Sequence, residues 1–399
     1  MNRNWKSFYN ILQKRERVII GLMSGTSLDG LDVAVCKITG HGLNTELKIL
    51  EFQTVLYDND LKRDIKAIFS KQLVDLQMVT LMNEKIGLLH AEMILGSLKE
   101  WGISPTEVDV IASHGQTIFH SPKSLHGKAD YPNATLQIGD GDHIAVKTGI
   151  ITIADFRQKH IAAGAEGAPL AVYGDYLYFS KENEVRIMLN IGGIANITYL
   201  PGEIGAASIF SSDIGPGNTL MDQFVQANFE DLYYDVDGII AGKGNINSDL
   251  LTALLIHDFF DLPFPKTTGP ELFNLDFLKS VQLKSNTIAI SNEDVLATLN
   301  KFTATVIADA IKRCTIHHPS VNVYYSGGGI HNKLLINHLK NDLPDVNFAT
   351  TDELGIIPDA KEAILFALLA NETLVGDPID FENRSGLPSI TMGKICLPY

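Results

Sequence analysis

Two glycine-rich turns, each lying between two apolar segments, are the strongest chemical signals in this chain. The first, in residues 18–35, contains Ser24-Gly25-Thr26-Ser27, and the second, in residues 185–199, contains Gly192-Gly193. Each pattern predicts a strand, a tight turn and a returning strand. Glycines and small hydroxyl residues let backbone N–H groups approach an anion closely. We therefore expect two related domains that hold one polyphosphate between them.

The acidic residues of the first turn need a separate explanation, because a carboxylate cannot neutralise phosphate. Asp29 lies at the tip of the turn, and Asp32 follows three residues later. Carboxylates beside a phosphate loop hold Mg²⁺ directly or through water, or else they cap backbone N–H groups of the turn. We favour the metal for Asp29 and leave both roles open for Asp32.

Polar residues also follow two predicted strands of the first half. Residues 108–113 and 150–155 are expected to be strands, and residues 73–100 a helix. Ligands of open α/β sheets bind beyond the carboxyl ends of strands, which selects His114, Gln116, Asp155 and Arg157. Because Asp155 and Arg157 are two apart on a segment expected to be extended, both can face the site. Alternatively, they form an ion pair with each other.

Two further turns of the second half carry glycines. Ser326-Gly327-Gly328-Gly329 follows a predicted strand, residues 321–325, and precedes a helix expected after Asn332. Such glycines allow close backbone approach and present a helix N-terminus. Residues 213–218 form another rigid turn with polar tips, which is either structural or part of the site.

The remaining pattern predicts the fold class. Ser291, with Asp294 three residues later, is typical of the N-cap of a helix that extends to about residue 313. Pro358 suits the first turn of a helix over residues 359–374. Strands and helices alternate in both halves, which predicts an α/β fold with mainly parallel sheets covered by helices. A polar segment, residues 180–184, marks the boundary between the halves.

Composition limits the classes of partner. The 399 residues are enough for two or three domains, and a net charge of −15 argues against nucleic acid or an anionic membrane as partner. A bound nucleotide therefore needs local cationic help, for which a divalent metal is the usual source. The three cysteines are widely spaced, and together with the lack of a signal-peptide pattern they indicate a reduced, cytoplasmic protein.

An amphipathic segment at the N-terminus predicts a short helix. Trp5, Phe8, Tyr9 and Leu12 have the spacing of one helical face. We expect this face to dock on the body of the protein, in preference to a partner or a membrane surface.

Several motifs, taken in order, resemble those of one family. Beyond residues 23–32, the matching segments run from about residue 18 to the C-terminus and are Ser113-His114-Gly115-Gln116-Thr117, Gln137-Ile138-Gly139-Asp140, Asp155-Phe156-Arg157, Gly167-Ala168-Pro169-Leu170, residues 190–196, residues 213–218 and residues 326–332. The chain resembles the anhydro-N-acetylmuramic acid kinases, which belong to the sugar kinase, Hsp70 and actin superfamily. One glycine-rich loop would be weak evidence, whereas the ordered set is specific.

The resemblance implies a fold, an activity and partners. The fold would be the two-lobed, actin-like ATPase fold, built from duplicated ribonuclease H-like domains with a cleft between the lobes. The first lobe would comprise residues 1–182 and the second residues 183–399, with the last segment either there or returned to the first lobe. The enzyme would use ATP and Mg²⁺ to convert 1,6-anhydro-N-acetylmuramic acid into N-acetylmuramic acid 6-phosphate in cell-wall recycling. The family also suggests a homodimer.

The resemblance assigns residues to two groups. The residues expected at ATP and its phosphates are Ser24, Gly25, Thr26, Ser27, Asp29, Gly30, Asp32, Gly192, Gly193, Asn196, Gly327, Gly328, Gly329 and Asn332. The residues expected at the sugar are Ser113, His114, Gln116, Gln137, Asp213, Gly217, Asn218 and Glu362, with Asp155 and Arg157 beside the reacting atoms. Glu362 is placed at the start of a helix of the second lobe, where the helix dipole would also favour its charge.

The chain departs from the family pattern at its catalytic centre. His160 stands where the family has an aspartate, the base that activates the water opening the anhydro bridge. Glu166 replaces a glutamine of the family, and Pro270 an arginine. Three interpretations remain open: His160 is the base, Glu166 supplies the carboxylate, or ring opening has been lost. The last would fit a kinase for a different sugar or an impaired ATP-binding regulatory protein.

Overall fold

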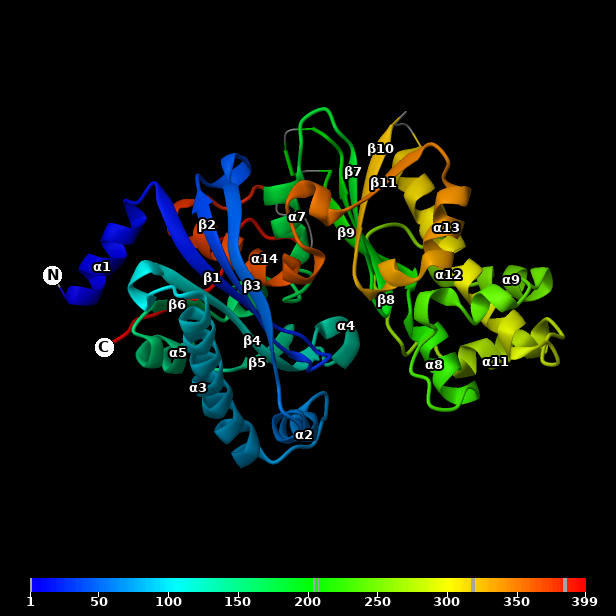
Figure 1. Ribbon diagram of the computed structural model, residues 1–399, viewed down its shortest axis with the longest axis horizontal. Helices are drawn as coiled ribbons and strands as arrows, with labels where there is room; N and C mark the ends of the chain where they lie inside the picture. The colour runs from blue at the N-terminus through cyan, green and yellow to red at the C-terminus, as the bar shows by residue number, and fades with distance from the viewer. Residues whose placement is uncertain (1, 204, 207, 317–319, 383–385) are drawn as a thin grey trace. The chain divides into compact units, whose positions relative to one another are not determined.

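The computed structural model describes residues 2–203, 205–206, 208–316, 320–382 and 386–399, which form two compact units (Figure 1). The first unit comprises Met1–Tyr178, Gly205–Ala207 and Gly355–Tyr399, and the second Phe179–Ile204 and Ser208–Leu354. The helix that contains Glu362 thus belongs to the first unit, which corrects its expected place in the second lobe.

A sheet with helices on both faces forms the first unit. Its elements in chain order are α1 (Arg3–Leu12), β1 (Glu16–Ser24), β2 (Gly30–Thr39), β3 (Glu46–Leu56), α2 (Asn59–Ile68), α3 (Leu76–Trp101), β4 (Val110–Ser121), α4 (Lys123–His126), β5 (Ala134–Ile138), α5 (Gly141–Thr148), β6 (Ile151–Ala154), α6 (Phe156–Ala162), α7 (Ala171–Phe179), α14 (Lys361–Val375) and β12 (Lys394–Cys396). The strand order is β12-β6-β4-β1-β2-β3, with β5 paired to β4.

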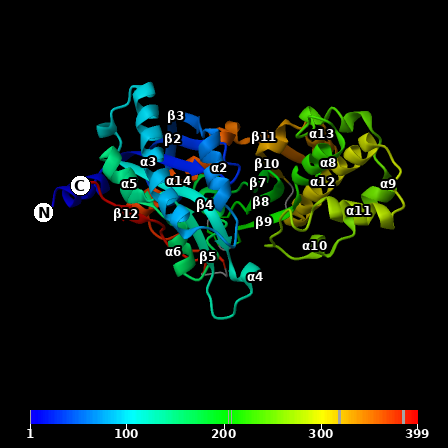
Figure 2. The same ribbon diagram turned by 90° about the horizontal axis from the view of Figure 1, so that it is seen from below.

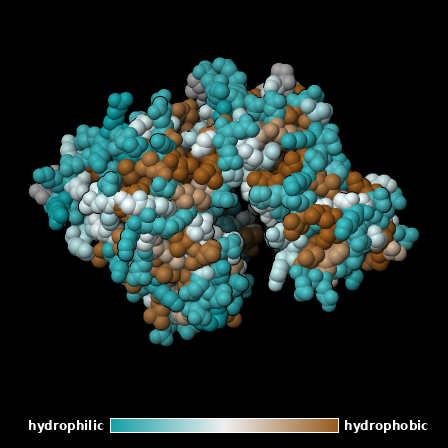
Figure 3. Space-filling model, in the orientation of Figure 1, coloured by the Kyte–Doolittle hydropathy of each residue, from teal (hydrophilic) through white to brown (hydrophobic). Residues whose placement is uncertain are grey.

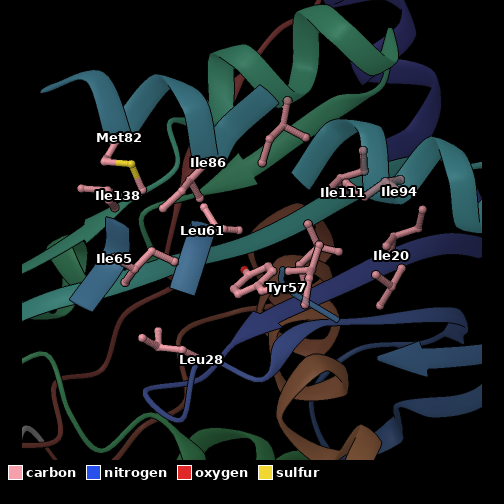
Figure 4. Close-up of a cluster of buried hydrophobic side chains, with 14 of the residues drawn as sticks. Ile20, Leu28, Tyr57, Leu61, Ile65, Met82, Ile86, Ile94, Ile111 and Ile138 are labelled. Carbon is pink, nitrogen blue, oxygen red and sulfur yellow. The ribbon is translucent and has the colours of Figure 1, made fainter. Parts of the chain in front are cut away.

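The alternation of side chains along β1 explains how two helices cover this sheet. Ile20 and Leu22 point into a buried cluster that includes α3 (Figure 4). Gly21 points to the other face, where an added Cβ would lie 1.9 Å from the carbonyl oxygen of Ala363 in α14. Only glycine permits this backbone contact, so α14 packs directly on β1.

The second unit repeats the plan of the first. Its elements are β7 (Arg186–Ile191), β8 (Ile194–Leu200), β9 (Phe210–Pro216), α8 (Thr219–Asn228), α9 (Ser248–Leu255), α10 (Asp258–Asp261), α11 (Leu275–Lys284), α12 (Asn292–Thr315), β10 (Val321–Ser326), the 3₁₀ turn η5 (Gly328–His331), α13 (Lys333–Asp342) and β11 (Val346–Thr350). The strand order is β11-β10-β7-β8-β9. Residues of α12 and α13 share one apolar core with β7 and β8, and α9, α11 and α12 lie together beyond it (Figure 2).

The repeated topology confirms the expected fold class. In each unit three consecutive strands form an antiparallel meander, and the first strand of the meander pairs in parallel with a later one: β1 with β4, and β7 with β10. This duplicated order is that of the actin-like ATPase fold. The sheets are mixed, and parallel pairings do not predominate in them as expected, because the short turns of the meanders can join only antiparallel strands.

The predictions for the N-cap of α12 and for the docking face of α1 had different outcomes. Ser291 caps α12 as predicted, because its hydroxyl accepts the backbone N–H of Asp294 at 3.1 Å. The predicted docking face of α1 was partly wrong: Phe8 and Leu12 are partly buried, but Trp5 and Tyr9 are about half exposed, and Ile11 is the buried residue of this helix. Hydrophobic residues also appear in patches among hydrophilic ones over the face shown in Figure 3.

Candidate active site

The turn between β1 and β2 is anchored below and open at its tip. Leu28 is buried in the apolar cluster of the first unit at a backbone φ of 61° (Figure 4). Thr26, Ser27 and Asp29, in contrast, are exposed. The backbone N–H of Tyr57 donates to the carbonyl of Asp29 at 3.0 Å. A buried leucine therefore holds the tip in place while its hydroxyls and amides face outward.

The Ser24 hydroxyl, which we expected to contact phosphate, is buried and already bonded. It donates to Oε1 of Gln116 at 2.5 Å and accepts the Tyr57 hydroxyl at 2.8 Å. The same hydroxyl of Tyr57 lies 2.7 Å from Nε2 of His90. Because Gln116 also donates to the Gly25 carbonyl at 3.3 Å, this network holds the base of the turn. We call Ser24, Gln116, Tyr57 and His90 the loop-support network.

Neither Tyr57 nor His90 was singled out from the sequence. His90 lies inside the long helix α3, where an isolated buried histidine has no distinguishing pattern, and Tyr57 follows an ordinary strand. Only the hydrogen bonds from His90 through Tyr57 to Ser24 show that both residues support the turn.

Asp32, beside the turn, is influenced by three other carboxylates. The Thr54 hydroxyl donates to Oδ1 of Asp32 at 2.5 Å. Burial first, and then the charges of Glu362, Asp359 and Asp29, nevertheless raise the pKa of Asp32 to about 6. An acidic group that is disfavoured in its charged form is well suited to a cation, which would offset both burial and mutual repulsion.

A chain of hydrogen bonds joins the residues expected at the sugar. Nε of Arg157 donates to Nε2 of His114 at 2.8 Å, and Nη1 donates to the carbonyl of Gly167 at 2.7 Å. The N–H of Gly167 in turn donates to Nδ1 of His160 at 3.0 Å. Burial, and after it the charge of Arg157, lowers the pKa of His160 to about 4. These side chains thus act as one rigid group around Gly167.

The expected extended geometry of Asp155 and Arg157 was wrong. Asp155 adopts a left-handed conformation at φ 58° and precedes α6, which contains Arg157. The Asp155 carboxylate pairs with Lys394 of β12, so the alternative of a mutual ion pair is also excluded. The signal missed was the short helix, whose seven residues are too few for a clear period.

The other residues expected at the sugar lie in the same unit. The Oγ of Ser113 and the Oε1 of Gln137 are buried and have no hydrogen-bond partner among the described residues, so each has hydrogen-bonding capacity that the protein leaves unused. Glu362, in the first turn of α14, is exposed on part of its surface. Desolvation raises the pKa of its carboxyl, and the charges of Arg157 and Lys361 oppose the rise. Glu166 is half-buried, and Oε1 of its carboxylate accepts the Ser124 hydroxyl at 2.9 Å.

In the second unit three glycine turns converge. The carbonyl of Gly192 accepts the N–H of Asn218 at 2.8 Å, and that of Gly193 accepts the N–H of Gly217 at 2.9 Å. A Cβ on Gly217 would lie 2.2 Å from the Gly192 oxygen, and one on Gly329 would lie 2.3 Å from Cγ2 of Ile191. The turn after β9 therefore packs on the backbone of the turn after β7, and the turn after β10 packs on Ile191, at distances that only glycines allow.

Polar side chains line the strand ends beside these glycines. Ser326, Asn190, Asn196 and Asp213 pair across four neighbouring strands and form one row. The Asp213 carboxylate accepts the N–H of Thr268 at 2.9 Å. Asn332 is less free than expected: its Oδ1 caps α13 and accepts Nδ2 of Asn300 at 3.1 Å, so this side chain supports the turn.

Comparison with known proteins identifies the family. A family model described as anhydro-N-acetylmuramic acid kinase matches residues 17–396. The chain belongs to the anhydro-N-acetylmuramic acid kinase family. Proteins of this name from Pseudoalteromonas atlantica and Pseudoalteromonas translucida are 57% and 54% identical to it, over 100% and 99% of both chains. Another from Caldanaerobacter subterraneus is 37% identical over 97% of this chain and 98% of its own.

Membership of this kinase family implies the use of ATP.

Within the part of the chain that the structure describes, no helix is long and apolar enough to cross a bilayer.

Proposed function

We propose that this protein is an ATP-dependent kinase that converts 1,6-anhydro-N-acetylmuramic acid into N-acetylmuramic acid 6-phosphate and opens the anhydro ring with water. The observation that carries the proposal is the kinase family match over residues 17–396, together with relatives 54–57% identical over essentially full length. Two groups of residues support it, namely the exposed turn of the first unit and the glycine turns of the second.

The residues around the first turn fit a nucleotide phosphate with Mg²⁺. Thr26 and Ser27 offer exposed hydroxyls, while Asp29 and Asp32 offer carboxylates. Mg²⁺ in phosphoryl-transfer sites typically keeps several waters and binds one or two carboxylates plus the phosphates. Among the described residues, no three acidic, histidine or cysteine side chains converge into a complete metal cage. This donor set therefore suits a water-rich ion held by Asp29, which would neutralise charge on the phosphates.

The polar residues of the first unit fit the sugar. The unpartnered Ser113 hydroxyl and Gln137 carbonyl oxygen can hydrogen-bond sugar hydroxyls and amides. Arg157 is held by His114 and Gly167, so its guanidinium is fixed and can orient an anionic group such as the lactyl carboxylate. Prior fixing of this kind lowers the entropic cost of placing the reacting oxygen.

The proposal is tested with the purified protein, ATP, Mg²⁺ and the anhydro sugar. ADP release in a coupled assay, and a product whose mass shows gain of both phosphate and water, are expected. ATP turnover with another sugar alone, or a product that gains phosphate but not water, would contradict it. A protein that binds ATP but releases no ADP would instead be a regulatory homologue.

Asp29→Asn tests the metal site. The change keeps the shape of the side chain and removes its charge, so phosphoryl transfer at fixed Mg²⁺ should fall by about 10²-fold or more, in line with the loss of one electrostatic group at a reacting phosphate. The activity should be measured from micromolar to high millimolar Mg²⁺. Unchanged turnover at every Mg²⁺ concentration would show that Asp29 does not hold the metal and is only a turn residue.

We also propose a cytoplasmic homodimer, as the family resemblance implies. The three cysteines are free thiols, as is usual in a reducing compartment. Light scattering on the purified protein tests the dimer, and a mass of one chain would refute it.

A further inference from the structure

Hydrogen-bond geometry around His160 determines which of its nitrogens carries the proton. A backbone N–H can only donate, so the bond from Gly167 requires an unprotonated Nδ1. The neutral ring then carries its proton on Nε2. This Nε2 is buried with no partner among the described residues, and the ring meets Tyr173 edge-on at 5.7 Å. His160 is fully buried, and its single lone pair is already used.

Glu166, six residues later, is presented by a backbone held on both sides. The Ala165 N–H donates to the carbonyl of His160 at 3.1 Å, and the Ala165 carbonyl accepts Nδ2 of Asn133 at 3.0 Å. On the other side, Gly167 is held through its N–H by His160 and through its carbonyl by Arg157. Four hydrogen bonds thus hold the backbone of the two residues that flank Glu166.

The Glu166 carboxylate remains accessible within this frame. Oε1 accepts the Ser124 hydroxyl, while Oε2 has no hydrogen bond among the described residues. Glu166 directly precedes Gly167, whose carbonyl accepts Nη1 of Arg157. A half-buried carboxylate on a rigid backbone, one residue from the carbonyl that holds the sugar-side arginine, has the properties of a general base.

We propose that Glu166 is the general base for ring opening and that His160 is a positioning residue, an inference that rests on the proposed kinase function. Glu166 takes a proton from a water whose oxygen forms the bond to the anomeric carbon. The bond from that carbon to O6 breaks, and O6 takes the electron pair and attacks the γ-phosphorus. The bond between this phosphorus and the bridging oxygen of ADP then breaks. The proton on Glu166 passes to solvent.

Two sugar substrates distinguish the loss of a general base from general damage to the active site. With the anhydro sugar, Glu166→Gln should lower kcat by about 10²–10⁴-fold, the usual contribution of a general base. With N-acetylmuramic acid, whose ring is already open, phosphorylation of O6 needs no activated water and should persist. Glu100→Gln, which removes an exposed carboxylate of the same unit, serves as the matched control. Equal losses on both sugars, or full activity on the anhydro sugar, would overturn the assignment.

Variants of His160 test the positioning role. Oδ1 of asparagine occupies the place of Nδ1, so His160→Asn can still accept the Gly167 N–H but cannot act as a base. We expect His160→Ala to lower kcat and His160→Asn to restore most of it, with the acid limb of the kcat/KM profile unmoved. An asparagine variant as inactive as the alanine variant would identify His160 as the base.

A double variant keeps the assignment testable if the open sugar is a poor substrate. Glu166→Gln combined with His160→Asp returns a carboxylate to the segment and should recover activity toward the anhydro sugar. Loss of this activity in Glu362→Gln, with Glu166→Gln fully active, would move the base to Glu362. A wild-type protein inert toward both sugars would refute the kinase function itself.

Discussion

The two units position their turns in different ways. In the first, side chains support the turn: Leu28 anchors it in the core, and the loop-support network holds its base. In the second, glycines allow the close approach: Gly217 lies on the backbone of Gly192 and Gly329 on Ile191, and neither position has room for a Cβ. Similar topologies can therefore present polar atoms through side-chain hydrogen bonds or through the absence of side chains. A single mutation should therefore lower the stability of the first arrangement only slightly, whereas a side chain added to the second should lower it more.

Gly217→Ala should have the largest effect. Its Cβ would meet a backbone oxygen at 2.2 Å, and neither atom belongs to a flexible side chain that could move away. We expect a loss of about 1–3 kcal/mol in the free energy of unfolding, typical of overpacking, and a loss of the ATP-induced shift in a thermal melt. Gly242→Ala is the control, since nothing lies within 4 Å of its Cβ. Equal stability of the two variants would show that the turn at Gly217 tolerates a side chain, and would contradict the contrast between the units.

Tyr57→Phe should have a smaller effect, confined to the first turn. The change deletes the hydroxyl between Ser24 and His90 and leaves the buried Nε2 of His90 without a partner. A cost of about 1–2 kcal/mol to unfolding is expected for one unsatisfied buried group. A higher KM for ATP should accompany it, whereas exposed Tyr131→Phe should change neither quantity. A stability loss without a change in KM would show that the network serves the core alone.

Asp32→Asn should have the smallest effect and the opposite sign. The folded-state pKa of about 6 lies above the ordinary value of 3.8 for an aspartate, so the charged carboxylate is disfavoured in the native state. This penalty is absent below about pH 4 and grows as the pH rises through 6. The variant should therefore be more stable at pH 8, by about 1 kcal/mol after allowance for solvent screening. A denaturant series that shows the gain at pH 4 as well would contradict electrostatic strain.

Sequence periodicity was sufficient where a single local pattern determined the structure. The two hairpins, the Ser291 cap and the strand before Ser326 all follow from residues near in sequence. The fold class came from the ordered motifs and was confirmed by the duplicated strand order. The partners of Ser24 could not be predicted, because Tyr57 and Gln116 reach it from distant segments.

The same limit explains the errors at the sugar side. Arg157 was expected on a strand because the apolar run before Asp155 gives no sign of the left-handed turn that starts α6. Similarly, histidine is a residue type that can act as a base. Only the hydrogen bond from the Gly167 N–H shows that Nδ1 of His160 is already occupied. Donor and acceptor directions depend on three-dimensional placement, which residue types alone do not specify.

The return of the chain to its first unit has a consequence for synthesis. The α14 helix packs on β1 through Gly21, and β12 pairs with β6, so the first sheet is completed by residues made after the second unit. The second unit, in contrast, ends at Leu354 and can fold while the remainder is still in the ribosome. Because such long-range closure is slow and leaves apolar surface uncovered meanwhile, the nascent first unit is the part of this protein most in need of a chaperone.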